Sequence, residues 1–173
     1  MPALESLLHD ANMAWDDLEL LVLVAGPGSF TGLRIAAATM AGLNSRLRLP
    51  VLQLSSLAVT ARQTGLEEIL VCEDARAGEC YVGRYRLGRP LEEDHCMPWH
   101  RFLERVPERF ASRSEPPVVM RGWQRVPLKH GRGQAMLDVA LDRLAEISDW
   151  ASLGIYPQPR YLQASQAERH AIQ

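Results

Sequence analysis

A glycine-rich stretch near the start of the chain holds the residues best placed to do chemistry. The apolar run 21–25 predicts a buried strand, and the glycines after it permit a sharp turn into a helix. Hydroxyl side chains in the turn can cap that helix, so that its first amides face an anion or another protein chain. The alternative is a tight connection that binds nothing. The residues singled out in this turn are Gly26, Gly28, Ser29, Thr31, Gly32 and Arg34.

The spacing of the turn differs from three familiar catalytic motifs. A P-loop ends in Gly-Lys-Ser or Gly-Lys-Thr, whereas no lysine follows Gly32. A dinucleotide-binding fingerprint needs its third glycine one residue earlier than Gly32. A nucleophile elbow needs one residue between glycine and serine, but Ser29 directly follows Gly28. The pattern therefore favours Ser29 as a helix cap rather than a nucleophile.

Four blocks of the sequence resemble the TsaB family, also called YeaZ, the bacterial partner proteins in threonylcarbamoyladenosine modification of tRNA. The blocks are 26–35 (GPGSFTGLRI), 49–57 (LPVLQLSSL), 74–81 (DARAGECY) and 159–163 (PRYLQ). The family's last block ends in an arginine that is Gln163 here, so no role of that arginine carries over.

The resemblance implies an α/β fold of the actin-like, Hsp70-type (ASKHA) class. We expect two lobes, residues 1–65 and residues 66–173. Family members begin with a strand and a hairpin, whereas this chain opens on what resembles the family's first helix, so we expect a first lobe truncated at its N-terminus. The strand at 20–24 would then have an open apolar edge, which favours self-association or low stability.

The resemblance also implies a non-catalytic scaffold that docks onto TsaD, the transferase, with the ATPase TsaE, for modification of tRNA next to the anticodon. Contact with tRNA, and with ATP or ADP, is expected only in the assembled complex, and no catalytic residue or metal is expected. A homodimer would use the same docking helices or the open sheet edge. The residues expected at the docking surface are Leu4, Leu8, Ala37, Met40 and Ala41; the alternative is that these side chains belong to the core.

An enzyme is the alternative function, either an actin-like nucleotide hydrolase or a peptidase-like protein. A peptidase needs a nucleophile next to a base, and no such motif is recognisable. The histidines are scattered at His9, His95, His100, His130 and His170.

The composition limits the classes of protein to which this chain could belong. The chain has 173 residues, of which 47% are hydrophobic, so it is long enough to bury a core. Its net charge of -2 gives no overall cationic field, which argues against strong autonomous binding of tRNA. The three cysteines lack a C-x-x-C spacing, and no apolar run approaches the length of a membrane span. With no recognisable signal peptide, a cytoplasmic location is expected.

Hydrophobic periodicity predicts alternating helices and strands in the first half and a hairpin in the second. The expected helices are 4–11, 31–46, 55–64, 98–110 and 134–148, the last with Leu137, Ala140, Leu141 and Leu144 on one face. The expected strands are 19–25, 50–54, 68–74, 79–86 and 117–120.

Three smaller groups carry weaker functional hypotheses. Charged residues at the hairpin turn predict a polar pocket or simply solvated side chains: Asp74, Arg76 and Glu79. A metal site would use His95, Cys96 and His100, but no fourth ligand is suitably spaced. A basic run with one aromatic would contact tRNA in a complex or be a solvated loop: Arg121, Trp123, Arg125, Lys129, His130 and Arg132.

Overall fold

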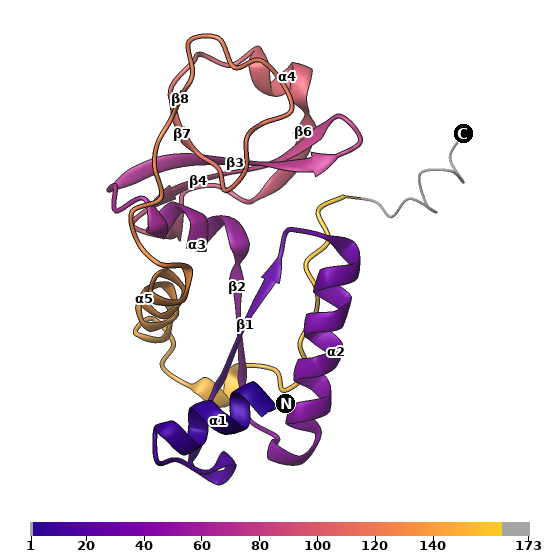
Figure 1. Ribbon diagram of the computed structural model, residues 1–173, viewed down its shortest axis with the longest axis vertical. Helices are drawn as coiled ribbons and strands as arrows, with labels where there is room; N and C mark the ends of the chain where they lie inside the picture. The colour runs from indigo at the N-terminus through magenta and orange to yellow at the C-terminus, as the bar shows by residue number, and fades with distance from the viewer. Residues whose placement is uncertain (1, 164–173) are drawn as a thin grey trace, which may run out of the picture.

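The computed structural model describes residues 2–163. It contains two sheets, a two-stranded parallel sheet and a larger mixed sheet (Figure 1). The small sheet pairs β1 (Leu21–Gly26) with β2 (Val51–Ser55). Helix α2 (Phe30–Leu47) connects the two strands and runs along one side of them (Figure 1). The elements before β1 are helix α1 (Pro2–Asp10) and the 3-10 helix η1 (Trp15–Asp17).

The larger sheet has the strand order β5-β4-β3-β7-β8, with β6 also paired to β4. Its central strands form an antiparallel hairpin, while β7 joins β3 in parallel. The strands are β3 (Glu68–Arg76), β4 (Glu79–Arg86), β5 (Arg89–Pro90), β6 (His95–Pro98), β7 (Arg109–Ala111) and β8 (Gln124–Arg125). The remaining elements are α3 (Ser56–Gln63), α4 (Trp99–Leu103), α5 (Arg132–Leu144) and the 3-10 helix η2 (Trp150–Ser152).

Local side-chain chemistry fixes both ends of α2. At its start the backbone N–H of Gly32 donates to Ser29 Oγ at 3.4 Å, so Ser29 caps the helix as the sequence predicts. Near its end the buried amide of Asn44 donates to the carbonyl oxygens of Leu49 at 2.8 Å and Ile155 at 2.7 Å. Asn44 therefore holds the chain that follows the helix, whose C-cap Arg48 is in the left-handed conformation, and it also binds the C-terminal segment.

The core is concentrated around the larger sheet and α3. One buried cluster joins α3, the hairpin and α5, and includes Leu57, Val71 and Tyr85. A second lies on the other face of the sheet, where Phe102 stacks on Trp123 with ring centroids 4.7 Å apart. The cluster around β1 is smaller and contains only three buried residues among those described: Leu23, Ala25 and Val51.

Two sequence predictions for the second half are wrong. The expected helix 98–110 is only α4, and residues 109–111 form β7 instead. The predicted strand 117–120 is irregular, and the strand beside β7 is β8 at 124–125. Short-range periodicity missed both because a two- or three-residue strand is specified by the neighbouring strand it pairs with, not by its own pattern.

Helix α5 buries only part of the face that the sequence predicts, since Ala140 is buried and Leu144 packs against the core cluster. Leu137 and Leu141 are 50% and 57% exposed, whereas Ala135, Val139 and Ala140 are buried. Small side chains let α5 lie close to α3, which contributes its own alanines to the same cluster.

The chain after α5 returns to the small sheet. The backbone N–H of Val51 donates to the Gly154 carbonyl at 2.9 Å, and that of Arg160 donates to the Ala25 carbonyl at 2.8 Å. The segment 154–163, called the tail segment below, thus lies against β1 and β2 although it is far from them in sequence (Figure 1). The lobe boundary near residue 65 stays a prediction.

None of the helices in residues 2–163 has both the length and the apolar character that crossing a membrane requires.

Candidate functional site

The glycine-rich turn lies against the tail segment and the start of α3. Gly26 has φ of +122°, and a Cβ there would lie 2.8 Å from the carbonyl oxygen of Arg160. Only glycine therefore permits both this backbone conformation and the close approach of the tail. On the other side Ser56 Oγ donates to the carbonyl oxygen of Pro27 at 2.5 Å. The turn thus lies between the backbone of the tail segment on one side and the Ser56 hydroxyl on the other.

A cleft of about 710 Å³ opens between this turn and the β3–β4 hairpin. Four of the six turn residues singled out from the sequence line it, while Gly26 and Gly32 do not. The tail segment closes one side. The lining residues are Gly28, Ser29, Phe30, Thr31, Leu33, Arg34, Glu73, Asp74, Ala75, Arg76, Tyr81, Arg113, Arg160, Tyr161, Leu162 and Gln163.

Charged side chains at the back of the cleft are paired with one another. Glu73 is 4% exposed and accepts from both the backbone N–H and the Nε of Arg113, each at 3.0 Å. Thr60 and Ser112 also donate to its carboxylate, at 3.4 Å each. These four hydrogen bonds compensate the burial of the Glu73 charge.

The rim of the cleft carries an exposed cation and two aromatic rings. Arg34 lies 4.0 Å from the centroid of the Phe30 ring, and Phe30 packs on Tyr161 at 4.9 Å. Arg34 makes no ion pair with any residue of the described chain, whereas Arg76 lies 3.7 Å from Asp74. Of the four arginines that line the cleft, three are paired with a carboxylate, so Arg34 supplies the unpaired positive charge, which favours an anionic ligand or partner.

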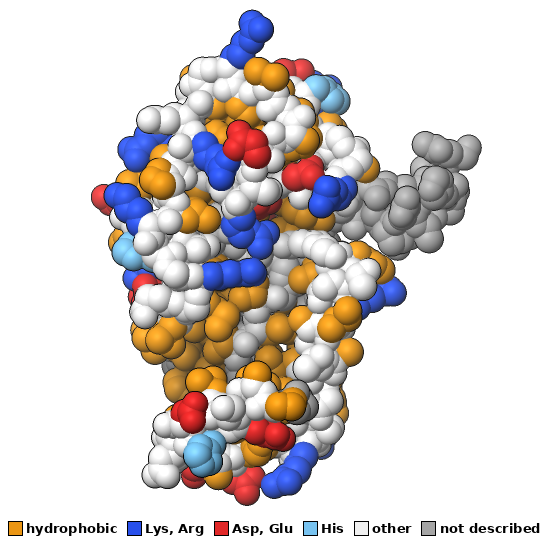
Figure 2. Space-filling view, viewed as in Figure 1, with side chains coloured by type: hydrophobic (Ala, Val, Ile, Leu, Met, Phe, Trp, Pro, Cys, Tyr) orange, Lys and Arg blue, Asp and Glu red, His pale blue; other side chains and the backbone are white. Residues whose placement is uncertain are grey.

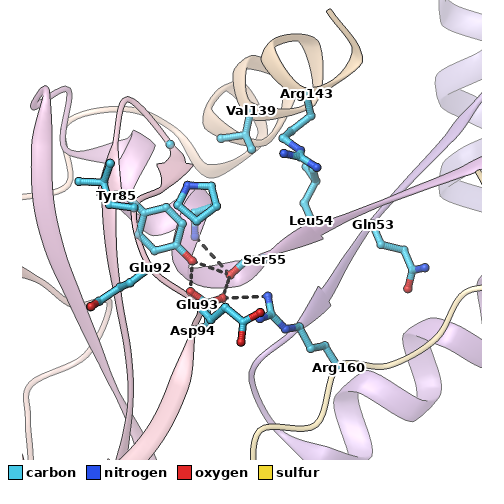
Figure 3. Close-up of a pocket in the computed structure, with 14 residues that line it drawn as sticks. Gln53, Leu54, Ser55, Tyr85, Glu92, Glu93, Asp94, Val139, Arg143 and Arg160 are labelled. Atoms are coloured by element: carbon cyan, nitrogen blue, oxygen red, sulfur yellow. Dashed lines mark hydrogen bonds and ion pairs between the residues drawn. The ribbon is translucent and has the colours of Figure 1, made fainter. Parts of the chain in front are cut away.

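A second cavity of about 380 Å³ adjoins the cleft and shares Arg160 with it (Figure 3). In Figure 3 the side chains of Ser55, Tyr85 and Arg160 converge on the buried carboxylate of Asp94. Ser55 Oγ donates to Asp94 Oδ2 at 2.5 Å, Tyr85 OH donates to Oδ1, and Arg160 Nη1 lies 3.3 Å from Oδ2. These four residues, the Asp94 cluster, come from β2, β4, the loop before β6 and the tail segment.

The surroundings of Tyr85 in the Asp94 cluster keep its phenol protonated. Burial, and then the adjacent Asp94 carboxylate, raise the pKa of Tyr85 above its ordinary value, so the phenol stays protonated and remains a donor. Ser55 Oγ already accepts from the backbone N–H of Leu57 at 3.1 Å, as the N-cap of α3. The cluster therefore joins four separate segments of the fold through hydrogen bonds and one ion pair.

A family model described as TsaD, tRNA N6-adenosine threonylcarbamoyltransferase, matches residues 1–103 of the chain. Curated relatives named tRNA threonylcarbamoyladenosine biosynthesis protein TsaB are 39% identical over 95 residues in Bacillus subtilis and 32% identical over 104 residues in Escherichia coli. The chain belongs to this family, among its TsaB members. The matches cover 54% and 58% of this chain but only 42% of either relative, so the chain spans less than half the length of these relatives.

Solved structures agree with the family and extend the likeness over the whole fold. YeaZ from Pseudomonas aeruginosa has a TM-score of 0.70 at 26% identity and covers 93% of this chain and 82% of its own. Another structure, described as an uncharacterized protein with similarity to peptidase YEAZ from the same organism, has a TM-score of 0.69 at 27% identity and covers 94% and 82%. The fold is therefore of the actin-like (ASKHA) class expected from the sequence.

The docking residues predicted for this TsaB-family chain differ in burial. On α1, Leu4 is 40% exposed and Leu8 is half-buried, and no residue of that helix is buried. On α2, Ala37 is buried and Met40 packs against the small cluster of Leu23, Ala25 and Val51, while Ala41 is half-buried. The structure thus exposes Leu4, leaves Leu8 and Ala41 half-buried, and turns Ala37 and Met40 inward.

The structure also places the three smaller groups of residues for which the sequence suggested a function. Asp74 and Arg76 line the cleft, and Gln163 donates to Glu79 across its edge. Within residues 2–163 no three side chains of the kinds that ligate metals come together, and His95 instead contacts the Glu93 carbonyl at 3.1 Å. Trp123 is packed in the core rather than presented to a partner. His170 lies outside the described residues.

Sequence reasoning missed the Asp94 cluster. Tyr85 and Asp94 fall in a hairpin strand and a charged loop, where nothing in the spacing marks them. The one signal in the sequence was a glycine inside a strand, Gly83, which often marks the close approach of another group. In the structure a Cβ at this position would lie 2.4 Å from Asp94 Oδ1. Arg160 stood inside the recognised block 159–163, but only the fold shows which carboxylate it meets.

Proposed function

We propose that the chain is a non-catalytic scaffold in threonylcarbamoyladenosine biosynthesis on tRNA, and that it docks onto a TsaD-type transferase with a TsaE-type ATPase. The observation that carries the proposal is family membership, together with the structural role of the one serine in the cleft lining. Ser29 Oγ serves as a helix cap, and no histidine lines the cleft in the described part of the chain.

Exposed apolar side chains on the first two helices support the docking part of the proposal. Leu7 on α1 is 64% exposed and Ile35 on α2 is 61% exposed, in addition to Leu4. Exposed apolar groups at helical spacing favour packing against a helix of a partner or of a second copy of the chain. ATP or ADP would bind only in the assembled complex, where the positive cleft lining would face the phosphates.

The edge of β1 is a second surface for self-association. Among the described residues β1 pairs as a strand only with β2, and the tail segment bonds to it at Ala25, so residues 21–24 keep an edge that a strand of another copy would occupy.

The direct test is mixing the chain with TsaD from the same organism and measuring the size of the complex by light scattering. We expect a mixed complex, and we expect Leu4→Asp combined with Leu7→Asp to abolish it because a charge replaces each apolar contact. The matched control is Leu87→Asp with Val106→Asp, which changes two exposed apolar residues outside α1 and α2. Absence of any complex with the unaltered chain would refute the docking proposal.

A Ser29→Ala variant separates the scaffold from an enzyme. We expect it to lose about 1 kcal/mol of stability through the helix cap and to support modification in a reconstituted reaction with TsaD and TsaE at an unchanged rate, read as threonylcarbamoyladenosine by mass spectrometry of digested tRNA. The matched control is Ser45→Ala on the same helix, whose hydroxyl donates to the Gly42 carbonyl but caps nothing. Loss of modification in Ser29→Ala alone would favour the enzyme.

A further inference from the structure

Charge is distributed very unevenly along this chain. Residues 1–20 contain five acidic residues and no lysine or arginine, whereas residues 109–132 contain six lysines and arginines and one acidic residue, Glu115. The net charge of -2 therefore conceals two regions of opposite sign. Such asymmetry sets how the protein orients toward a charged partner.

The basic residues lie along the segment that runs from β7 at the edge of the larger sheet to the start of α5. Strand β7 pairs in parallel with β8, which places Phe110 opposite Arg125, and Arg113 and Arg125 line one shallow cavity of about 510 Å³. Figure 2 shows lysine and arginine side chains spread over the upper half and the middle of this face, with some acidic side chains among them, and the larger sheet occupies that upper half in Figure 1. Acidic side chains surround α1 at the opposite end of the same view.

Most of these cations have no acidic partner within the protein. Arg113 pairs with Glu73, and Arg125 pairs with Glu115. The side chains of Arg109, Arg121, Lys129 and Arg132 are exposed and form no ion pair with any residue from 2 to 163. We call these four residues the basic surface.

We propose that the basic surface binds the phosphate backbone of RNA. This rests on the proposed function only in taking tRNA as the RNA concerned. Three of the four cations are arginines, whose planar guanidinium matches phosphate oxygens in a bidentate manner.

An acidic protein is the less favoured partner for the same surface. Stable protein interfaces have an apolar centre, and Val119 is the one large apolar side chain in 109–132 that is strongly exposed. The aromatic ring of Trp123 is packed against Phe102 and Phe110, so base stacking is not offered. The expected contact is therefore electrostatic, independent of sequence, and steeply dependent on salt.

The test is fluorescence anisotropy of a labelled, unmodified tRNA transcript with the full chain at several NaCl concentrations. We expect weak binding whose affinity falls linearly with salt on logarithmic axes. Lys129→Gln with Arg132→Gln should weaken binding roughly tenfold at low salt and reduce the slope by about two. The matched control is Arg46→Gln with Arg48→Gln, which removes two exposed cations near the C-terminal end of α2 and should leave binding unchanged.

Three results would overturn the proposal: no binding at low salt, equal losses in the two variants, or displacement by polyglutamate as effective as displacement by unlabelled RNA. The last would indicate an acidic protein as the partner. The reconstituted modification reaction keeps this proposal distinct from the proposed function. A chain that binds RNA through the basic surface but supports no modification would refute the scaffold alone. A Lys129→Gln, Arg132→Gln variant that binds RNA normally would refute the basic surface alone.

Discussion

Helices α2 and α3 each follow a parallel strand and each begin with a serine cap, yet they are used in opposite ways. Helix α3 buries seven of its eight residues between the larger sheet and α5. Helix α2 buries two of its eighteen, and α1 beside it buries none. The same local α/β pattern thus produces one helix fixed in a core and another with most of its surface free.

The two helices mark regions with different roles, one for the stability of the fold and the other for contact with a partner. The region around the larger sheet holds two of the three buried clusters, so it should carry most of the unfolding free energy. The region of α1, α2 and β1 keeps large apolar side chains exposed, as a surface for a partner requires. The Asp94 cluster and the tail segment join the two regions.

The largest expected effect is in the core of the larger sheet. Phe102 is fully buried against Trp99 and Trp123, so Phe102→Ala should cost about 3–5 kcal/mol of unfolding free energy, measured by urea denaturation. The control Leu7→Ala on α1 should change it by less than about 0.5 kcal/mol. Equal losses at the two positions would remove the contrast between the regions.

A smaller effect is expected where the two regions meet. Asp94→Asn removes the charge that holds Arg160 and weakens the acceptor of Ser55 and Tyr85, at a cost of about 2 kcal/mol. Hydrogen exchange should increase at Arg160, whose backbone N–H bonds to Ala25, because the tail segment loses its anchor. Glu92→Gln, an exposed neighbour on the same loop, should have neither effect. Unchanged exchange in the Asp94 variant would show that backbone contacts alone hold the tail.

The smallest effect concerns thiol reactivity and leaves the structure intact. Burial raises the pKa of Cys80 to about 12 and also raises the pKa of Cys72, so very little of either thiol is ionised at pH 8. Cys96 is only half-buried. We expect a thiol reagent at pH 8 to modify one cysteine rapidly in the folded chain and all three in urea. Rapid reaction of all three without urea would mean that the larger sheet opens readily.

The sequence by itself determined the first half of the fold. Apolar runs predicted β1 and β2, small residues and capping serines predicted α2 and α3, and the hairpin β3–β4 followed from its turn. These elements are long enough for their own periodicity to specify them. The glycine-rich turn was also evident, because a positive φ at Gly26 demands that residue type.

The short strands, the buried face of α5 and the Asp94 cluster depend on tertiary contacts. Strands β7 and β8 exist because each is paired with a neighbour. Helix α5 turns Ala135 and Ala140 toward the core and leaves Leu137 and Leu141 exposed, because the close approach of α3 leaves room for small side chains. The meeting of Ser55, Asp94 and Arg160 joins three positions far apart in the chain. Periodicity records which face of an element is apolar, whereas contacts between distant segments depend on how the whole chain packs.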